Sequence, residues 1–207
     1  MYNVQFDAET HTYTVNGAAV PNVTTICAPL GADYDEPDDD LELTIEAAAD
    51  RGLTLHAYLE HRLNGGDPDD FEMPSIYAGY AEAVDNFLAE HEITPYLIET
   101  PLGCANFAGT PDLIAGFDGD NTAIIDWKFV SQMAKSKIAG QIGGYENLCN
   151  ENGIFPTCFY AVQFLKDGKY RIYEVDIVFA RAAWNACRQI HDLKNCKHPR
   201  GKIGGNK

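Results

Sequence analysis

Basic residues are scarce in the first part of the sequence. Only Arg51 and Arg62 precede Lys128, alongside 25 acidic residues, whereas 13 basic and 6 acidic residues occur from Lys128 onward. The formal net charge is -16. Because binding to a polyanion normally draws on lysine and arginine, the first part alone is unsuited to it. The asymmetry predicts a basic surface supplied by the second part of the chain; the alternative is a merely solvated acidic surface.

Long apolar runs are also lacking. No run approaches the roughly 20 apolar residues that a membrane-spanning helix needs, so a membrane-spanning chain is excluded. Met1 is followed by the polar residues Asn3, Gln5 and Asp7, which do not resemble the apolar core of a signal peptide. We therefore expect a cytoplasmic protein.

Closely spaced cysteines are absent. No C-x-x-C pair occurs, and without an export signal neither a disulfide framework nor a zinc site is expected. Reduced, mostly buried thiols are the preferred interpretation. The cysteines are Cys27, Cys104, Cys149, Cys158, Cys187 and Cys196.

The rest of the composition is that of a globular protein. The chain of 207 residues is 45% hydrophobic and 11% aromatic, enough to bury one sizeable core. We predict a single domain over 1–207, in which 32–42 form an acidic, solvated loop and 194–207 form a basic, flexible tail.

Hydrophobic periodicity predicts an α/β fold. Asn16-Gly17 favours a tight turn, and the alternation around it predicts an N-terminal β-hairpin. The order of the remaining segments predicts a central mixed β-sheet flanked by helices. Helices are predicted over 41–63, 75–91, 137–150 and 181–195, and strands over 96–102, 110–117, 122–130, 157–166 and 170–179.

Two predicted strands bring acidic side chains and a lysine together. Residues two apart in a strand share a face, so Asp126 and Lys128 project together while Trp127 points away into the core. The hairpin about 118–121 brings Asp112 alongside them. Phosphodiester hydrolysis needs this combination, because carboxylates hold the divalent cations that activate water and neutralise charge. Taken alone, D-x-K is more often a surface ion pair on an edge strand.

Further polar pairs occur at helical spacing. His56 and Glu60 lie four residues apart on the first predicted helix, and Gln141 and Tyr145 are spaced likewise on the third, so each pair shares a helix face. The adjacent glycines at 143–144 cost the helix about 1 kcal/mol each relative to alanine. Such a cost predicts a close backbone approach at that point.

The order of these motifs resembles a known family. RG-x3-H-x3-E, then G-x-x-D, then D-x-K, then Q-x3-Y is similar to the RecB-like branch of the PD-(D/E)XK nucleases, and the opening HTYTVNGAAVPNVTTI resembles phage-encoded members. The resemblance spans about residues 11–165. It implies a restriction-endonuclease-like core.

The resemblance also implies a metal site. In that family a helix-borne histidine and two acids bind the metal, together with a main-chain carbonyl between the second acid and the lysine. Carried over, His56, Asp112, Asp126 and the carbonyl of Trp127 would hold Mg2+ or Mn2+. Lys128 would be the catalytic lysine.

Other residues receive supporting roles by the same resemblance. Glu60 would support the metal site or hold the water of a second ion. Gln141 and Tyr145 would position DNA near the scissile phosphate. Glu99 lies where relatives often carry a glutamate, or is a surface residue of an edge strand. Arg51 would contact phosphate or pack between helices.

Some relatives carry an iron-sulfur cluster, which needs four cysteine thiolates. Here Cys27 is suitably early, but only Cys187 and Cys196 lie late, so no cluster is expected.

The functional expectation is a metal-dependent deoxyribonuclease. The resemblance implies an exonuclease that acts on DNA ends in phage-type recombination, replication or repair, in the host cytoplasm. A single-strand annealing or binding protein would be its partner, and a ring of subunits would require homo-oligomerisation. The alternatives are a structure- or nick-specific endonuclease and a non-catalytic DNA- or protein-binding module on the same fold.

Overall fold

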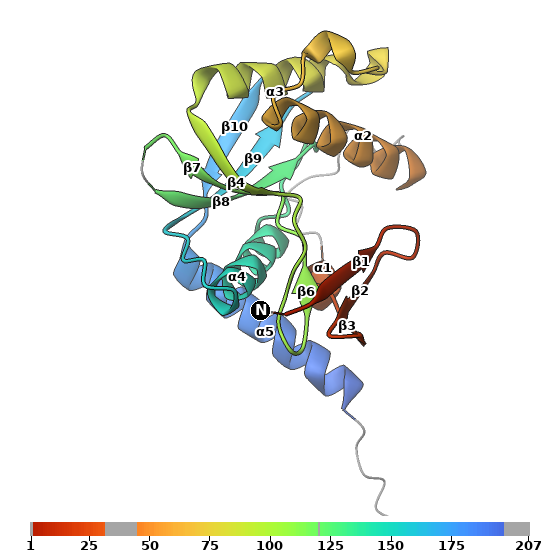
Figure 1. Ribbon diagram of the computed structural model, residues 1–207, viewed down its shortest axis with the longest axis vertical. Coiled ribbons are helices and arrows are strands. Elements are labelled where there is room, and N and C mark those ends of the chain that lie inside the picture. Colours follow the sequence, from red (N-terminus) through yellow and green to blue (C-terminus); the bar gives the residue numbers. More distant parts are fainter. Residues whose placement is uncertain (1, 32–44, 120, 197–207) are drawn as a thin grey trace, which may run out of the picture.

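The computed structural model describes residues 2–31, 45–119 and 121–196 (Figure 1). Its centre is a five-stranded sheet of order β10-β9-β8-β7-β4. Only β8 and β9 are parallel neighbours; the other pairs are antiparallel. The predicted central mixed sheet is therefore confirmed. Its strands are β4 (Ile93–Ile98), β7 (Leu113–Phe117), β8 (Thr122–Lys128), β9 (Cys158–Phe164) and β10 (Tyr170–Glu174).

Helices cover both faces of this sheet, as Figure 1 shows. One core joins α2 and α3 to the sheet face of Ile125 and Trp127. A second core joins α1, α4 and α5 to the face of Ile124. The predicted alternation along 122–130 is thus observed, and it places Asp126 on the α4 side. The helices are α1 (Val23–Cys27), α2 (Ile45–Leu63), α3 (Ala78–Glu90), α4 (Lys135–Glu151) and α5 (Ile177–Asn195), with short 3-10 turns η1 (Ala28–Leu30), η2 (Pro68–Asp70) and η3 (Ser75–Tyr77).

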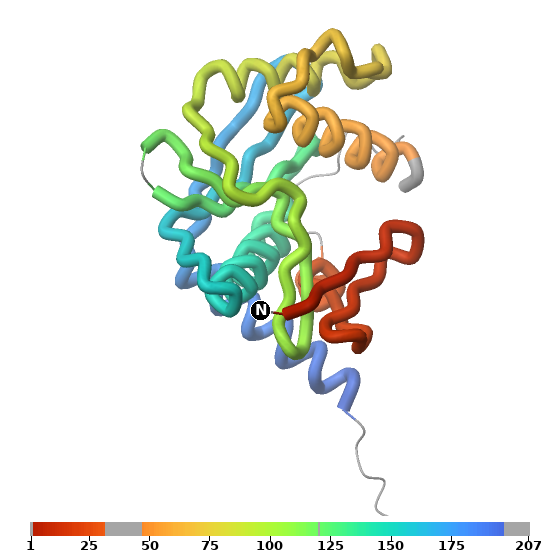
Figure 2. The backbone as a smooth tube through the Cα atoms, in the orientation of Figure 1, coloured from red at the N-terminus to blue at the C-terminus, as the bar shows by residue number. Residues whose placement is uncertain are grey.

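The N-terminal strands form a small sheet of their own. The predicted hairpin is present as β2 (Thr12–Val15) and β3 (Ala18–Val20), and its turn residues Asn16 and Gly17 both have positive φ. A further strand, β1 (Val4–Asp7), pairs with β2. In Figure 2 this red segment lies beside the green β5–β6 hairpin, which consists of β5 (Leu102–Gly103) and β6 (Ala108–Gly109).

Several predicted boundaries need correction; for example, the helix predicted over 181–195 begins at Ile177 and the strand predicted over 110–117 begins at Leu113. The strand expected over 170–179 ends at Glu174, because the Asp176 side chain accepts from the N–H groups of Val178 and Phe179 and caps α5. The same helix reaches Asn195, so the start of the predicted tail is helical. The strand predicted over 96–102 begins at Ile93 and stops at Ile98.

Some expectations fall outside the described residues. These are the acidic loop over 32–42, the first four positions of the helix predicted over 41–63, and the tail over 197–207. Among the helices that the structure describes, none has the length and apolar character needed to cross a membrane.

The glycines at 143–144 lie where α4 packs closely on its neighbours. A Cβ on Gly143 would come within 2.3 Å of the Ala180 carbonyl oxygen of α5, and one on Gly144 within 2.7 Å of the Val23 side chain of α1. The predicted close approach is therefore a helix-helix contact. It brings α1 and α4 together beside the ends of β7 and β8 that carry the acidic residues.

Candidate active site

The two strand-borne carboxylates meet where β7 begins and β8 ends. Leu113 of β7 lies opposite Ile125 of β8, which brings Asp112 next to Asp126. Asp112 accepts a hydrogen bond of 2.7 Å from the main-chain N–H of Trp127. Both carboxylates are buried, with Asp126 only 1% exposed. The Trp127 ring packs in the opposite core, as expected for alternating strand residues.

His56 reaches this site from α2. Its Nδ1 lies 2.7 Å from Oε1 of Glu99 and 3.9 Å from Oδ1 of Asp112. Glu99 directly follows β4 and has a φ of 40°, a left-handed conformation that is strained for a residue with a side chain. Its main-chain N–H donates a hydrogen bond of 3.0 Å to the carbonyl oxygen of Asp112. The strain therefore occurs where the glutamate turns toward the histidine.

Lys128 faces Asp126 across 2.5 Å, measured from Nζ to Oδ2. This contact is a short ion pair, and Oδ2 has no further polar partner among the described residues. The lysine charge offsets part of the cost of burying this carboxylate. The carboxylate retains a lone pair that a second cation can use.

Burial and mutual repulsion disfavour the ionised carboxylates. Burial raises the pKa of Asp112, against the opposing effects of His56 and Lys128. Burial likewise raises the pKa of Asp126 to about 6, with a further contribution from Asp112. Burial lowers the pKa of Lys128, but Asp126 and Asp112 outweigh it and raise that pKa overall. The lysine is therefore held protonated beside two crowded acids.

One imidazole and two carboxylates converge closely enough to share a cation. Ligand atoms of His56, Glu99 and Asp112 all lie within 4.8 Å of one another. Carboxylate oxygens and an imidazole nitrogen are common metal ligands in proteins, so these residues fit a divalent ion. Asp126 lies outside this group and pairs with Lys128 instead. The sequence left the role of Glu99 open. In the structure Glu99 is part of the cluster that could bind the ion.

Two of the residues expected to position DNA lie on α4. Gln141 and Tyr145 are buried on α4, and Nε2 of Gln141 donates to Oγ1 of Thr24 at 3.2 Å. Burial raises the pKa of Tyr145 well above its usual value, and the nearby Asp112 and Asp126 add to the shift. Tyr145 lines the same cleft as Asp112, so it lies close to the acidic site.

Arg51 and Glu60 lie on different sides of α2. Arg51 is buried with its guanidinium over the Tyr80 ring at 5.5 Å, which favours helix packing over phosphate contact. Glu60 is exposed and lines the same cleft as His56.

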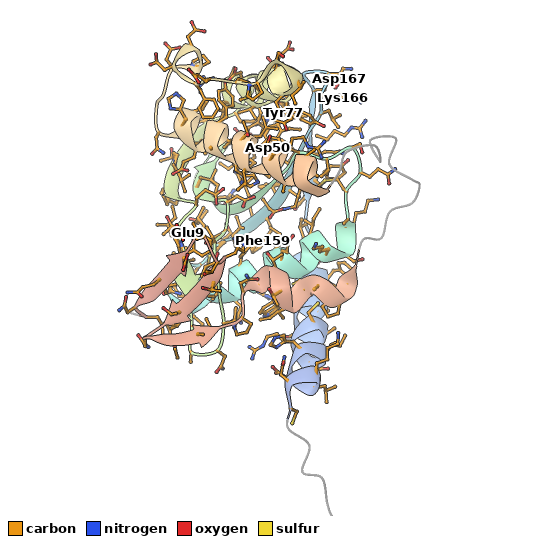
Figure 3. The ribbon with its side chains drawn as sticks, turned by 90° about the vertical axis from the view of Figure 1, so that its right-hand side faces the viewer. Glu9, Asp50, Tyr77, Phe159, Lys166 and Asp167 are labelled. Carbon is orange, nitrogen blue, oxygen red and sulfur yellow. The ribbon has the colours of Figure 1, made fainter. Side chains whose placement is uncertain are left out.

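A cleft of about 740 Å³ opens onto these groups. Its walls come from the N-terminal sheet, α1 and α2, and its lining includes His56, Glu99, Asp112 and Tyr145. Figure 3 shows α2, with Asp50 labelled, above the N-terminal sheet, whose β1–β2 turn carries Glu9. The candidate ligands therefore lie within reach of a substrate.

Sequence reasoning missed two contributors. Thr24 belongs to a five-residue helix too short for a periodic pattern, yet it holds Gln141 and lines the cleft. Gln163 is 1% exposed in β9 opposite Lys128. A glutamine inside an apolar strand was the available signal for it, since buried polar side chains need partners.

No protein-family model and no curated protein matches the sequence. Among solved structures, the chain is similar to an alkaline exonuclease from Laribacter hongkongensis, with 15% identity, coverage of 85% of this chain and 92% of that chain, and a TM-score of 0.40. It is similar to a phage-related exonuclease from Haemophilus somnus 129PT, with 10% identity, coverage of 85% and 95%, and a TM-score of 0.38. These structural neighbours are an alkaline exonuclease and a phage-related exonuclease.

Proposed function

We propose that this chain is a single-domain, metal-dependent deoxyribonuclease that hydrolyses phosphodiester bonds. The observation that carries the proposal is the ion pair of buried Asp126 and half-buried Lys128 beside the cluster of His56, Glu99 and Asp112. Together they offer a cation site that opens onto the cleft and a lysine charge beside that site. Hydrolysis of an anionic diester needs both.

In this proposal the acidic residues and the lysine have different roles. When bound, Mg2+ or Mn2+ supplies an activated water and neutralises the phosphate. The carboxylates of Asp112, Glu99 and Asp126 and the imidazole of His56 would hold the ion, with the Trp127 carbonyl as a further ligand. The neighbouring acids favour the protonated form of Lys128 by raising its pKa, and in this proposal the lysine stabilises the transition-state phosphate and orients water.

The finer part of the proposal is exonuclease action on DNA ends in phage-type recombination, replication or repair. It rests on the motif resemblance. A covalently closed circle separates it from a structure- or nick-specific endonuclease, because an obligate exonuclease leaves the circle intact.

The decisive experiment digests end-labelled linear duplex with Mg2+ or Mn2+. Lys128→Ala should lower kcat about 100-fold or more, the loss typical of a deleted transition-state donor, while DNA binding persists. Asp167 and Lys169 supply a matched control, because they form an exposed Asp-x-Lys ion pair with the same 2.5 Å separation. Lys169→Ala should cut like the wild type.

Two outcomes would overturn the proposal. Full activity in Lys128→Ala would remove the lysine from the reaction. Inactive wild-type protein on linear, nicked and single-stranded DNA would favour the non-catalytic binding module.

A further inference from the structure

One wall of the cleft is a stripe along α2. Ala49, Leu53, His56 and Glu60 all line it, spaced three or four residues apart as one helix face requires. Leu53 therefore lies about one helical turn, roughly 5.4 Å, from the candidate ligand His56. The stripe changes from apolar to polar as it approaches the site.

The opposite wall carries aromatic rings from the N-terminal sheet. Phe6 of β1, His11 of the turn and Tyr13 of β2 line the cleft. The ring centroid of Phe6 lies 4.6 Å from that of Tyr13 and 5.2 Å from that of His11. Tyr13 is anchored by a 2.8 Å hydrogen bond between its hydroxyl and that of Thr110. Phe6 is thus held in place by two rings.

Both walls present apolar surface to an open space. Phe6 is 36% exposed and Leu53 is 75% exposed. Among the described residues that line the cleft, none is a lysine or an arginine. A stacked duplex held by phosphate contacts would require such cations. The cleft instead offers a cation site at its base and planar apolar surface at its mouth.

We propose that the cleft holds an unstacked nucleobase of the strand being cut, with its face against Phe6 and its edge against Leu53. The inference rests on the proposed function, since it assigns the scissile phosphate to the metal site. A nucleotide matches this distribution because its phosphate is anionic and its base is a flat ring. Base-aromatic stacking tolerates any sequence, since every base has a π-face. The substrate is then a strand whose bases are unpaired at the point of cleavage.

The test compares two single strands of equal length, one normal and one with every base removed. Both carry the same phosphates, so their affinities differ only through the bases. Fluorescence anisotropy is measured with Ca2+ in place of Mn2+, and a gel verifies that the strand remains uncut. Wild-type protein should prefer the normal strand by about 5- to 100-fold, the range of base-aromatic stacking. The preference should persist at high salt, because stacking releases no counterions.

Variants locate the effect. Phe6→Ala and Leu53→Ala should each lower this preference, and Phe6→Trp should retain it. Phe155→Ala is the matched control, because Phe155 is 70% exposed and lies outside the cleft lining. If Phe6→Ala lowers the melting temperature, Leu53→Ala still tests the base site. The Leu53 side chain is mostly exposed to solvent, so its removal should not destabilise the fold.

The outcomes separate this inference from the nuclease proposal. Equal binding of both strands by a protein that cleaves DNA with Mn2+ overturns the base site and leaves the nuclease. An unchanged preference in both alanine variants does the same. A base preference that depends on Phe6, in a protein that cleaves no substrate, overturns the nuclease and leaves the base site.

Discussion

Gln163 lies directly opposite Lys128 in the parallel pairing of β8 and β9. Its Nε2 donates to the carbonyl oxygens of Val130 at 2.9 Å and Ser131 at 2.8 Å. Its Oε1 accepts from the hydroxyl of Tyr173 at 3.0 Å. The side chain thus fixes the main chain that leaves the strand of Lys128, and Gln163 is a positioning residue in our interpretation.

Gln163→Met keeps the length of the side chain and removes these hydrogen bonds. It should destabilise the fold by about 1–3 kcal/mol, because two carbonyls lose their donor. If Lys128 shifts as a result, kcat should fall by about 10- to 100-fold while KM changes little. Steady-state kinetics and denaturant unfolding measure the two effects. The exposed Gln5→Met is the control, and an unchanged kcat in a destabilised Gln163→Met would reduce the glutamine to a purely structural role.

A divalent cation should stabilise the fold through the acidic cluster. Mn2+ at about 100 times its Kd adds about 2.7 kcal/mol, which corresponds to a rise in Tm of about 5–10 °C for a chain of this size. The rise should vanish in Asp112→Asn, because that carboxylate contacts both His56 and the Trp127 main chain. The exposed Asp67→Asn should respond like the wild type. Thermal unfolding with and without Mn2+ decides, and an equal rise in Asp112→Asn would place the ion elsewhere.

The same titration distinguishes two ligand sets. The motif resemblance implies that Asp126 is a metal ligand, whereas the short distances between ligand atoms in the structure indicate Glu99. If Glu99 binds the ion, Glu99→Gln should lose most of the rise in Tm. A full rise in Glu99→Gln, together with loss in Asp126→Asn, would support the set implied by the resemblance.

Much of this arrangement was predictable because it depends on short spacings. Residues two apart on a strand share a face, so Asp126 and Lys128 had to project together, and a hairpin had to bring Asp112 beside them. The helical spacing of Gln141 and Tyr145 fixed their common face in the same way.

Other features depended on tertiary contacts that no local pattern encodes. Glu99 meets His56 across 43 positions of chain by adopting a backbone conformation that propensity disfavours. Gln163 bonds to main-chain carbonyls more than thirty positions away, and main-chain partners leave no trace in side-chain identity. From the sequence alone, Arg51 could have contacted phosphate or packed between helices. The position of the Tyr80 ring under its guanidinium favours packing.

The basic surface predicted from the charge asymmetry can be tested through salt dependence. Lys135 begins α4, and with Arg171 it lines a second pocket of about 300 Å³. Within the described part of the chain, no ion pair neutralises Lys135, Lys137 or Arg171. Replacing both lysines with alanine should weaken DNA binding and flatten the slope of log K against log salt by about 1.4–1.8, depending on strandedness. The control pair is Lys169 and Lys194, and an unchanged slope would remove this surface from the DNA path.

Replacement by alanine should have opposite effects at two helical glycines, because one is packed closely against a neighbouring helix and the other is not. At Gly143 a new Cβ would lie 2.3 Å from the Ala180 carbonyl oxygen, and because that atom belongs to the backbone, it cannot simply rotate away. Gly143→Ala should therefore destabilise by about 1–3 kcal/mol. At Gly52 of α2 no atom lies within 4 Å, so Gly52→Ala should stabilise by about 0.5–1 kcal/mol. Chemical denaturation of both variants measures the difference, and a neutral Gly143→Ala would show that α4 can move away from α5 without cost.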